Sequence, residues 1–225
     1  MKDFENKYIL KNSDAPKLLD ILMSRCPLDS EYPKAQIVSL YFDTPDKKLL
    51  KEKINSDLIK TKYRVRWYRD FNTKLATGKP FLEVKGKLGE VRNKYRKQMD
   101  ISSQEFEQLG YQDSFFSLVT EELMSLKPYS FPLFPFMLIS YQRVRFKVPG
   151  TQIRFCLDFN IHVPKINEQF GITTKPYMLK EAVFEIKGPE EDLPEFMKII
   201  ETLGGRRDSF SKYLACYQMI KNTKE

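Results

Sequence analysis

Charged side chains occupy every second position in several segments of this 225-residue sequence. Lys62, Arg64 and Arg66, for example, alternate with aromatic and aliphatic residues. Successive side chains of a β-strand point to opposite faces of the sheet, so this spacing predicts a strand with one charged face and one apolar face. The alternation recurs in five more segments, which carry Glu83, Lys85 and Lys87; Arg92, Lys94 and Arg96; Arg143 and Arg145; Arg154 and Asp158; and Glu185 and Lys187.

The chemistry that these residues favour is the binding of a phosphate-rich molecule. Like charges on neighbouring strands repel one another, so a sheet face crowded with lysine and arginine calls for a polyanion to neutralise it. Arginine binds phosphate through two parallel hydrogen bonds, and lysine acts as a movable point charge. Taken singly, each segment could instead be a solvated strand face, and the glutamate–lysine neighbours could be ion pairs without a ligand.

The composition limits the chemical class of the binding partner but does not identify the partner. A net charge of +8, with 41% hydrophobic and 30% charged residues, indicates a globular protein with an acidic partner. That partner could be nucleic acid, an anionic membrane surface or a phosphate-rich small molecule. The single histidine, His162, argues against a histidine-rich zinc site and against a histidine-based catalytic triad.

The cysteines and the hydropathy pattern predict a cytoplasmic protein. Cys26, Cys156 and Cys216 are odd in number and widely spaced, as expected for free thiols in a reducing compartment. The first residues do not resemble a signal peptide, and no window has the roughly 20 apolar residues that a membrane span requires. We therefore expect no membrane span.

A single domain over residues 1–225 is expected, because no repeat or long linker interrupts the sequence. The segment from Ser102 to Glu105 resembles a capping box, and Gly204-Gly205 is expected to separate two helices near the end of the chain. The three prolines between residues 126 and 135 predict a loop. The predicted strands cover residues 4–11, 37–43, 60–69, 80–87, 91–100, 137–147, 152–160 and 180–188. The predicted helices follow residues 12–14 and 44–46 and cover 103–109, 113–127, 191–203 and 210–222.

The expected fold class is α+β. The apolar face of such a sheet must be covered by helices, and its charged face must be kept from being left open. A sheet that closes into a barrel meets both requirements, because the charges then line the lumen. We therefore predict an eight-stranded antiparallel β tunnel with a charged lumen, flanked by helices. The apolar residues that alternate with the charges, among them Trp67, Val84, Phe155 and Ile186, are expected to pack beneath the terminal helices.

A family resemblance agrees with this fold. The runs FENKYIL, SLYFDTPD, KYRVRWY, FLEVKGK, ISYQRVRF, IRFCLDFNI, VFEIKG and FSKY follow one another in this order. In order and spacing they resemble the VTC (vacuolar transporter chaperone) domain, the polyphosphate polymerase branch of the triphosphate tunnel metalloenzymes. The resemblance implies an antiparallel tunnel that binds ATP and polyphosphate or tripolyphosphate. It also implies transfer of the γ-phosphoryl group of ATP to a polyphosphate chain, with Mn²⁺ or Mg²⁺ as cofactor.

Matching positions give the roles that the resemblance implies for individual residues. Tyr141 and Ser211 fall on phosphate-contacting hydroxyls, and Lys62, Lys94 and Arg96 are expected to bind substrate as well. The metal ligand is expected to be Glu185 first, then Glu5 and Glu83, since Mg²⁺ or Mn²⁺ needs only one or two carboxylates beside phosphate and water. The catalytic, phosphate-binding cations are expected to be Lys7, Arg64, Arg66, Lys85, Arg143, Arg154, Lys187 and Lys212.

Other functions remain open at this point. Asp3, Glu5 and Lys7 approach the ExExK signature of the CYTH triphosphatases, which makes hydrolysis of tripolyphosphate or a nucleoside triphosphate the main alternative. A third possibility is a binding module for polyphosphate or a nucleotide without turnover. Nucleic acid is not expected, because no helix carries a one-sided stripe of lysine and arginine and no stacking motif accompanies the charges. The sequence does not identify a protein partner.

Overall fold

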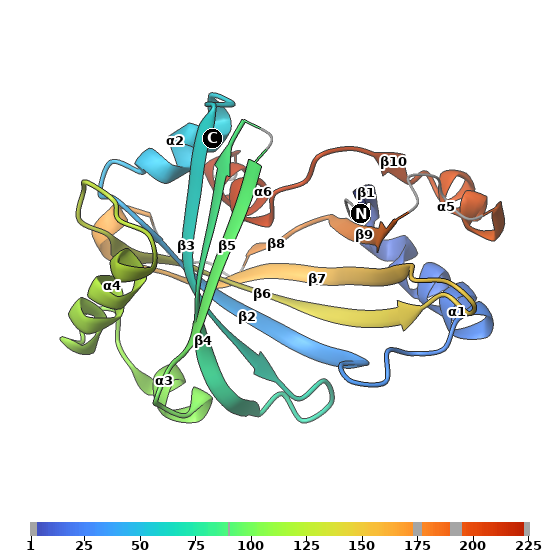
Figure 1. The fold of residues 1–225 in the computed structure, drawn as a ribbon, viewed down its shortest axis with the longest axis horizontal. Helices are drawn as coiled ribbons and strands as arrows, with labels where there is room; N and C mark the ends of the chain where they lie inside the picture. Colours follow the sequence, from blue (N-terminus) through green and yellow to red (C-terminus); the bar gives the residue numbers. More distant parts are fainter. Residues whose placement is uncertain (1–3, 90, 173–176, 190–194, 223–225) are drawn as a thin grey trace.

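The fold is built on one large antiparallel sheet (Figure 1). The computed structural model describes residues 4–89, 91–172, 177–189 and 195–222. Within them the strand order is β10-β1-β9-β7-β6-β2-β3-β4-β5, and the short strand β8 pairs with β7. The strands are β1 (Phe4–Lys11), β2 (Lys34–Asp43), β3 (Ile59–Arg69), β4 (Ala76–Leu88), β5 (Val91–Gln98), β6 (Phe134–Lys147), β7 (Arg154–Ile166), β8 (Tyr177–Met178), β9 (Glu181–Gly188) and β10 (Arg206–Arg207).

The eight predicted strands are confirmed, with shifts at their ends. β4 begins at Ala76, before the predicted start, because an irregularity after Arg66 restores the pairing of Tyr68 with Thr77. β6 already begins at Phe134, although Pro135 follows it. Proline is tolerated near the first residue of a strand, where its missing N–H breaks no interior hydrogen bond of the sheet. The predicted loop over residues 126–135 is therefore shorter than expected.

The helices lie in the intervals that the sequence predicts. The capping box of helix α3 (Ser103–Gln108) is present: the Glu105 N–H donates to the Ser102 hydroxyl, and the Ser102 N–H donates to the Glu105 carboxylate. In the predicted helix over residues 191–203, the described part forms the 3-10 helix η3 (Glu195–Lys198) followed by α5, and residues 191–194 lie outside the described residues. The α-helices are α1 (Ala15–Arg25), α2 (Lys48–Ile54), α3 (Ser103–Gln108), α4 (Phe115–Leu126), α5 (Ile199–Thr202) and α6 (Lys212–Asn222).

Two separate groups of helices cover the outer face of the sheet. Trp67 and Val84 pack with residues of α3 and α4, so the prediction that they lie beneath the terminal helices is wrong. The helices that follow β4 and β5 in the chain fold back onto these strands, as sequential elements usually do. Phe155 and Ile186 pack instead with residues of α1, η3 and α5.

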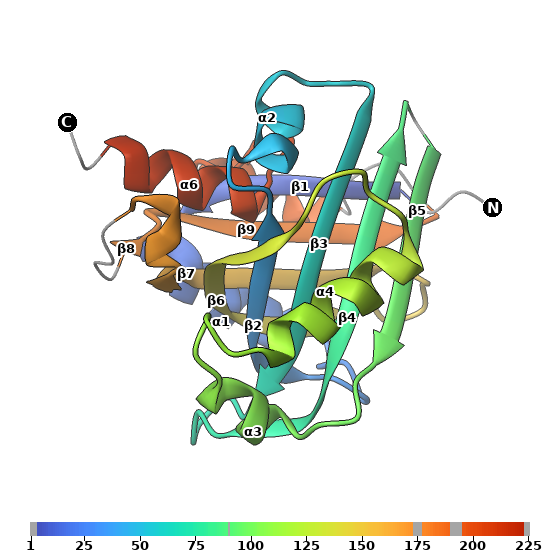
Figure 2. The ribbon, with the colours of Figure 1, turned by 90° about the vertical axis from the view of Figure 1, so that its left-hand side faces the viewer.

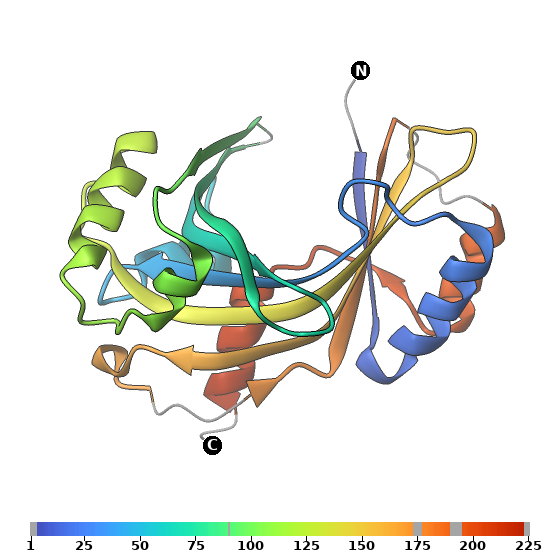
Figure 3. The same ribbon diagram turned by 90° about the horizontal axis from the view of Figure 1, so that it is seen from below.

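The sheet is bent, so that β3, β4 and β5 cross β1, β9 and β7 at a steep angle (Figures 2 and 3). Helix α6 packs on the inner side of the bend. Its Tyr213, Cys216 and Ile220 join a core with Ile139 and Val183 of the sheet. The remainder of the inner face carries the charged residues described below. None of the helices in the described part of the chain is long and apolar enough to cross a membrane.

Candidate functional site

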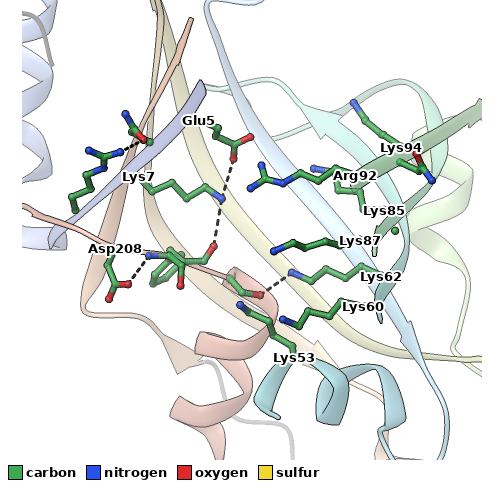
Figure 4. Close-up of a pocket in the computed structure, with 17 residues that line it drawn as sticks. Glu5, Lys7, Lys53, Lys60, Lys62, Lys85, Lys87, Arg92, Lys94 and Asp208 are labelled. Carbon is green, nitrogen blue, oxygen red and sulfur yellow. Dashed lines mark hydrogen bonds and ion pairs between the residues drawn. The ribbon is translucent and has the colours of Figure 1, made fainter. Parts of the chain in front are cut away.

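A cavity of about 670 Å³ lies between strands from the two ends of the sheet order (Figure 4). Glu5 and Lys7 of β1 face Arg92 and other cations of β3, β4 and β5 across it. The bend of the sheet therefore encloses a common space between its first and last strands. Nine lysines and arginines line the cavity: Lys7, Lys53, Lys60, Lys62, Lys85, Lys87, Arg92, Lys94 and Arg207. Two carboxylates, Glu5 and Asp208, share the lining with them.

The strand register sets these cations in two rows across β3, β4 and β5. In the first row Lys62 lies opposite Lys85, which lies opposite Lys94. The second row holds Lys60, Lys87 and Arg92. Directly opposed residues of antiparallel strands have Cβ atoms about 5 Å apart, so each row places three positive groups side by side. Neither row contains a carboxylate. An anionic ligand would therefore relieve the repulsion between the positive groups of each row.

This crowding changes the pKa of two lysines. The positive charge of Arg64, with burial, lowers the pKa of Lys85 to about 6. Burial and then the charge of Arg64 lower the pKa of Lys62 to about 7, and its ammonium also lies 3.0 Å from the Ser211 hydroxyl. At pH 8 both amines are therefore largely neutral while the cavity is free of ligand.

We expect tripolyphosphate to bind with proton uptake. The anion favours the charged form of both lysines, so binding at pH 8 should take up about one to two protons and should weaken as the pH rises from 6 to 9. Calorimetric titration in two buffers of different ionisation enthalpy measures this uptake. The Lys62→Met/Lys85→Met double variant is the control and should show little of it. Binding heats that do not depend on the buffer in the unmodified protein would contradict the expectation.

Deeper on the same strands, Glu83 joins three arginines. Arg64 donates to one Glu83 oxygen through Nε at 2.8 Å and Nη2 at 2.5 Å. Arg66 lies 3.7 Å and Arg96 3.5 Å from the same carboxylate. Burial alone would raise the pKa of Glu83, but Arg64 and Arg66 hold it at about 2. Glu83 is therefore ionised and orients the three guanidinium groups.

The opposite wall contains a second charged network. Asp158 of β7 is fully buried and receives two hydrogen bonds from Arg143, at 2.5 and 2.6 Å. The ammonium of Lys212, the first residue of α6, lies 2.6 Å from the same carboxylate. Glu185 of β9 lies 3.5 Å from Arg143 and 3.9 Å from Lys212. Burial would raise the pKa of Glu185, but Arg143, Lys212 and Lys187 hold it far below its ordinary value.

Buried aromatic contacts fix the first turn of α6, which carries part of this network. Tyr213 donates a 2.5 Å hydrogen bond to the buried carboxylate of Asp43 at the end of β2. Its ring stacks on Tyr41 with 4.7 Å between the centroids, and the Tyr41 hydroxyl accepts a hydrogen bond from Arg64. These contacts connect the arginines of β3 to the start of α6, where Ser211 precedes the helix and Lys212 is its first residue.

Comparison with known proteins identifies the family. The model of the VTC domain matches residues 2–221. The chain belongs to the VTC domain family. A search of curated proteins finds no match. Among solved structures, a protein of Pyrococcus horikoshii superimposes with a TM-score of 0.53 at 14% identity, over 99% of this chain and 100% of the other. A candidate adenylate cyclase of Bacillus halodurans gives 0.51 at 16% identity, over 94% and 96% of the two chains. These likenesses support a CYTH-like fold for this VTC domain.

Glu5 and Glu185 fit a divalent cation better than Glu83 does. They lie on the paired strands β1 and β9 and share two lysines. Lys7 is 3.0 Å from Glu5 and 3.9 Å from Glu185, and Lys187 is 3.8 and 3.6 Å from them. Two ionised carboxylates beside a phosphate site supply the hard oxygen ligands that Mg²⁺ or Mn²⁺ prefers. Glu83 stands alone among three guanidinium groups and is bound by Arg64 at 2.8 and 2.5 Å, whereas the cations beside Glu5 and Glu185 lie 3.0 to 3.9 Å away.

Two further observations bear on the metal. Within the described ranges, no three histidine, cysteine, aspartate or glutamate side chains form a metal-binding group, so substrate oxygens and water would complete the shell of a cation at Glu5 and Glu185. Asp3, the other acidic residue of the predicted amino-terminal signature, lies outside the described residues.

The three cysteines of this VTC domain are buried and free.

The structure brings most of the predicted site residues into the two walls. Lys62, Arg64, Arg66, Glu83, Lys85, Lys94 and Arg96 belong to β3, β4 and β5, and Glu5, Lys7, Arg143, Arg154, Glu185 and Lys187 belong to β1, β6, β7 and β9. The Tyr141 hydroxyl lies 3.4 Å from Arg66, and the ammonium of Lys212 lies 4.7 Å from the Tyr141 ring centroid. Arg154 is exposed and pairs with Lys187 at the margin of its wall.

The prediction missed several cations of the cavity. Lys60, Lys87 and Arg92 continue the alternation of the predicted strands and could have been included as site residues on that signal. Lys53 enters the cavity from α2, and Arg207 from the short strand β10. No strand alternation marks these two, because their positions depend on how segments distant in the sequence pack against the sheet.

Proposed function

We propose that this VTC domain is a metal-dependent polyphosphate polymerase. It binds ATP and a polyphosphate chain in a tunnel formed by the bent sheet and transfers the γ-phosphoryl group of ATP to the chain, releasing ADP. The observation that carries the proposal is the pair of cationic rows across β3, β4 and β5, which face Glu5 and Lys7 across the cavity. This arrangement is suited to a linear anion with a charge on every unit.

The residues present are suited to phosphoryl transfer. The transferred group needs accurate placement and neutralisation of the charge on its oxygens more than covalent help from the protein. Glu83 and Tyr41 hold Arg64, and Glu83 and Ser39 hold Arg66, so both guanidinium groups are oriented in advance to neutralise charge on phosphate oxygens. Lys62 and Lys85 follow along the same strands and can hold the next phosphates. A divalent cation held by Glu5 and Glu185 would add charge neutralisation between the two walls.

A tunnel triphosphatase is the second candidate. The position of Glu5 favours it, since this residue of the ExExK-like segment lines the cavity beside Lys7, where it could assist metal-dependent attack by water. The same basic walls would bind the substrate in either reaction. The two functions differ in the acceptor, which is a phosphate chain in one and water in the other.

Product analysis distinguishes these functions. Purified protein is incubated with ATP and Mn²⁺, with and without a short polyphosphate primer, and polyphosphate, ADP and orthophosphate are resolved separately. Polymer with a matching amount of ADP is the expected result. Orthophosphate without polymer would establish the triphosphatase instead. Tight binding of tripolyphosphate without turnover would indicate that the protein is a binding module, and it would overturn the proposed polymerase activity.

The Glu185→Gln variant tests the metal site. We expect metal-dependent turnover to fall by at least about 10- to 100-fold, the loss that follows even from removing an outer partner of a metal ligand. Tripolyphosphate binding without metal should persist, because the cations remain and one opposing carboxylate is lost. The assay is turnover against Mn²⁺ concentration, with Glu168→Gln, an exposed glutamate of the 3-10 helix Glu168–Phe170, as the control. Unchanged turnover in Glu185→Gln would show that another residue binds the metal.

A further inference from the structure

Exposed apolar side chains lie together at one end of β3, β4 and β5. In the register Ile59 lies opposite Leu88, and Leu88 lies opposite Val91. Each of the three is next in sequence to a cation of the second row of the cavity, so strand alternation turns the cations into the cavity and the apolar side chains to the outer face. The three apolar side chains are 55 to 62% exposed.

Two more residues extend this surface, which we call the apolar tip and which consists of Leu58, Ile59, Leu88, Val91 and Phe131. The N–H of Gly89 donates to the carbonyl of Leu58 at 3.0 Å, which joins the loop before β3 to the turn after β4. A hollow of about 630 Å³ is lined by Leu58, Ile59 and Phe131. Contiguous exposed apolar surface of this kind marks a site of contact with another protein or with a membrane.

The base of the apolar tip is held by the fold. The Tyr129 ring meets Phe131 edge-on, with 5.9 Å between centroids, and the Tyr129 hydroxyl donates to one oxygen of Glu52 in α2 at 3.3 Å. The other Glu52 oxygen accepts from the N–H of Thr61 in β3 at 2.8 Å. A surface that is fixed before binding loses little conformational entropy when it meets its partner.

The apolar tip projects from one end of the molecule, where the loop between α2 and β3 lies beside the turn between β4 and β5 (Figures 1 and 2). Cations outnumber carboxylates around it. The acidic residues are Glu52, whose two oxygens are already bound, Asp57, and Glu90, which lies outside the described residues. The cations that line the hollow or the adjoining part of the cavity are Lys48, Lys51, Lys53, Lys60, Lys87 and Arg92.

This excess of positive charge bears on which partner the apolar tip can meet. A second copy of the chain would bring like charges together, which disfavours contact between two apolar tips. An anionic lipid surface attracts lysine and arginine and also offers an apolar interior just beneath its phosphates. Lys48 already lies beside the apolar surface, with its ammonium 2.9 Å from the centroid of the Phe131 ring.

We propose that the apolar tip inserts into the surface of an anionic lipid membrane, with the neighbouring cations on the lipid phosphates. The insertion uses the outer face of the same strands whose inner face lines the cavity. The inference therefore goes beyond the proposed function and does not depend on it.

The Leu58→Ser/Val91→Ser double variant tests the inference by co-sedimentation with vesicles of phosphatidylcholine and phosphatidylglycerol in equal amounts. We expect the unmodified protein to bind these vesicles and to bind pure phosphatidylcholine vesicles far less. The double variant should bind the anionic vesicles at least about 10-fold more weakly, because burial of one large apolar side chain is worth a factor of about 10 or more. Its tripolyphosphate affinity should stay within about twofold of the unmodified protein, since exposed apolar side chains outside the cavity are changed.

The Met23→Ser/Leu118→Ser double variant is the matched control. It also replaces two exposed apolar side chains, which lie on α1 and α4, and should bind the anionic vesicles as the unmodified protein does.

Three results would overturn the inference. The first is the absence of vesicle binding by the unmodified protein. The second is binding that is unchanged in Leu58→Ser/Val91→Ser and abolished by tripolyphosphate, because the cavity cations alone would then hold the lipid. The third is a dimer in light scattering that only the apolar-tip variant dissociates, because the surface would then be an interface between copies of the chain.

Discussion

Replacing Arg143 with methionine is expected to lower the free energy of unfolding by about 3 kcal/mol. Asp158 has no exposed surface and receives two short hydrogen bonds from Arg143. Removing one partner of a buried ion pair leaves the other charge without compensation, which costs about 3 to 5 kcal/mol. The lower figure applies here because Lys212, whose ammonium lies 2.6 Å from Asp158, is retained in the variant and still compensates part of the charge. Phosphate binding should weaken in parallel, since Glu185 also loses a positive neighbour.

Urea unfolding at several pH values checks this result. Burial would raise the pKa of Asp158, but Arg143 and Lys212 hold it below the ordinary value of 3.8. The stabilisation by the pair is therefore present above about pH 4 and is lost as the pH falls through the lower folded-state pKa. Arg143→Met should have a flatter stability curve in this acidic range. Arg154→Met, which removes an exposed arginine of the same wall, is the control and should change stability by less than about 0.5 kcal/mol. Equal stability of the two variants would contradict the expectation.

The strands and the charged face could be predicted because both depend on local alternation. Each lysine or arginine at every second position identifies a strand and one face of it, and the structure confirms this over β3, β4 and β5. The pairing across strands could not be predicted in the same way. That Lys62 lies opposite Lys85, and Arg64 opposite Glu83, depends on the register between the strands. A shift of one residue would have turned the charges to the other face.

Other features depend on contacts between segments that are distant in the sequence. The two hydrogen bonds from Arg143 to Asp158 follow from the pairing of β6 with β7, and the contact of Lys212 with Asp158 requires α6 to pack inside the bend. The covering of Trp67 and Val84 by α3 and α4 is a further example. Alternation shows that a residue is apolar on one face of a strand, but it does not show which helix covers that face.

Replacing Lys85 with methionine is expected to have opposite effects on binding and on stability. Loss of a charge-assisted hydrogen bond to phosphate should weaken tripolyphosphate binding by about 10- to 100-fold. The free protein should gain about 1 kcal/mol of stability, because the methionine removes a cation from the row of Lys62, Lys85 and Lys94. The gain is modest because the Lys85 side chain lines a cavity that water enters: the surrounding walls lower its pKa, but the water still screens part of the repulsion.

The dependence of this stability gain on pH has a definite sign. Positive neighbours, Arg64 first, and burial lower the pKa of Lys85 to about 6 in the folded protein, from 10.5. Below pH 6 the folded protein must carry the charged lysine, so the repulsion is at its full strength. The repulsion fades as the pH rises from 6 toward 10.5, since the folded state then holds fewer protons than the unfolded state. The stability difference between Lys85→Met and the unmodified protein should therefore be largest near pH 6 and should approach zero near pH 10.

The control for Lys85→Met is Lys79→Met on the same strand, where Lys79 forms a surface ion pair with Asp100. It should change both binding and stability little, because exposed pairs contribute less than about 1 kcal/mol. Chemical unfolding at pH 6, 8 and 10, together with tripolyphosphate titrations, provides both readouts. If Lys85→Met lost both stability and tripolyphosphate binding, Lys85 would instead be a residue that stabilises the fold as an ion-pair partner of Glu83. Greater stability with weaker binding would show that the lysine row holds a charge which only a bound anion relieves, and this is the property that a polyphosphate site requires.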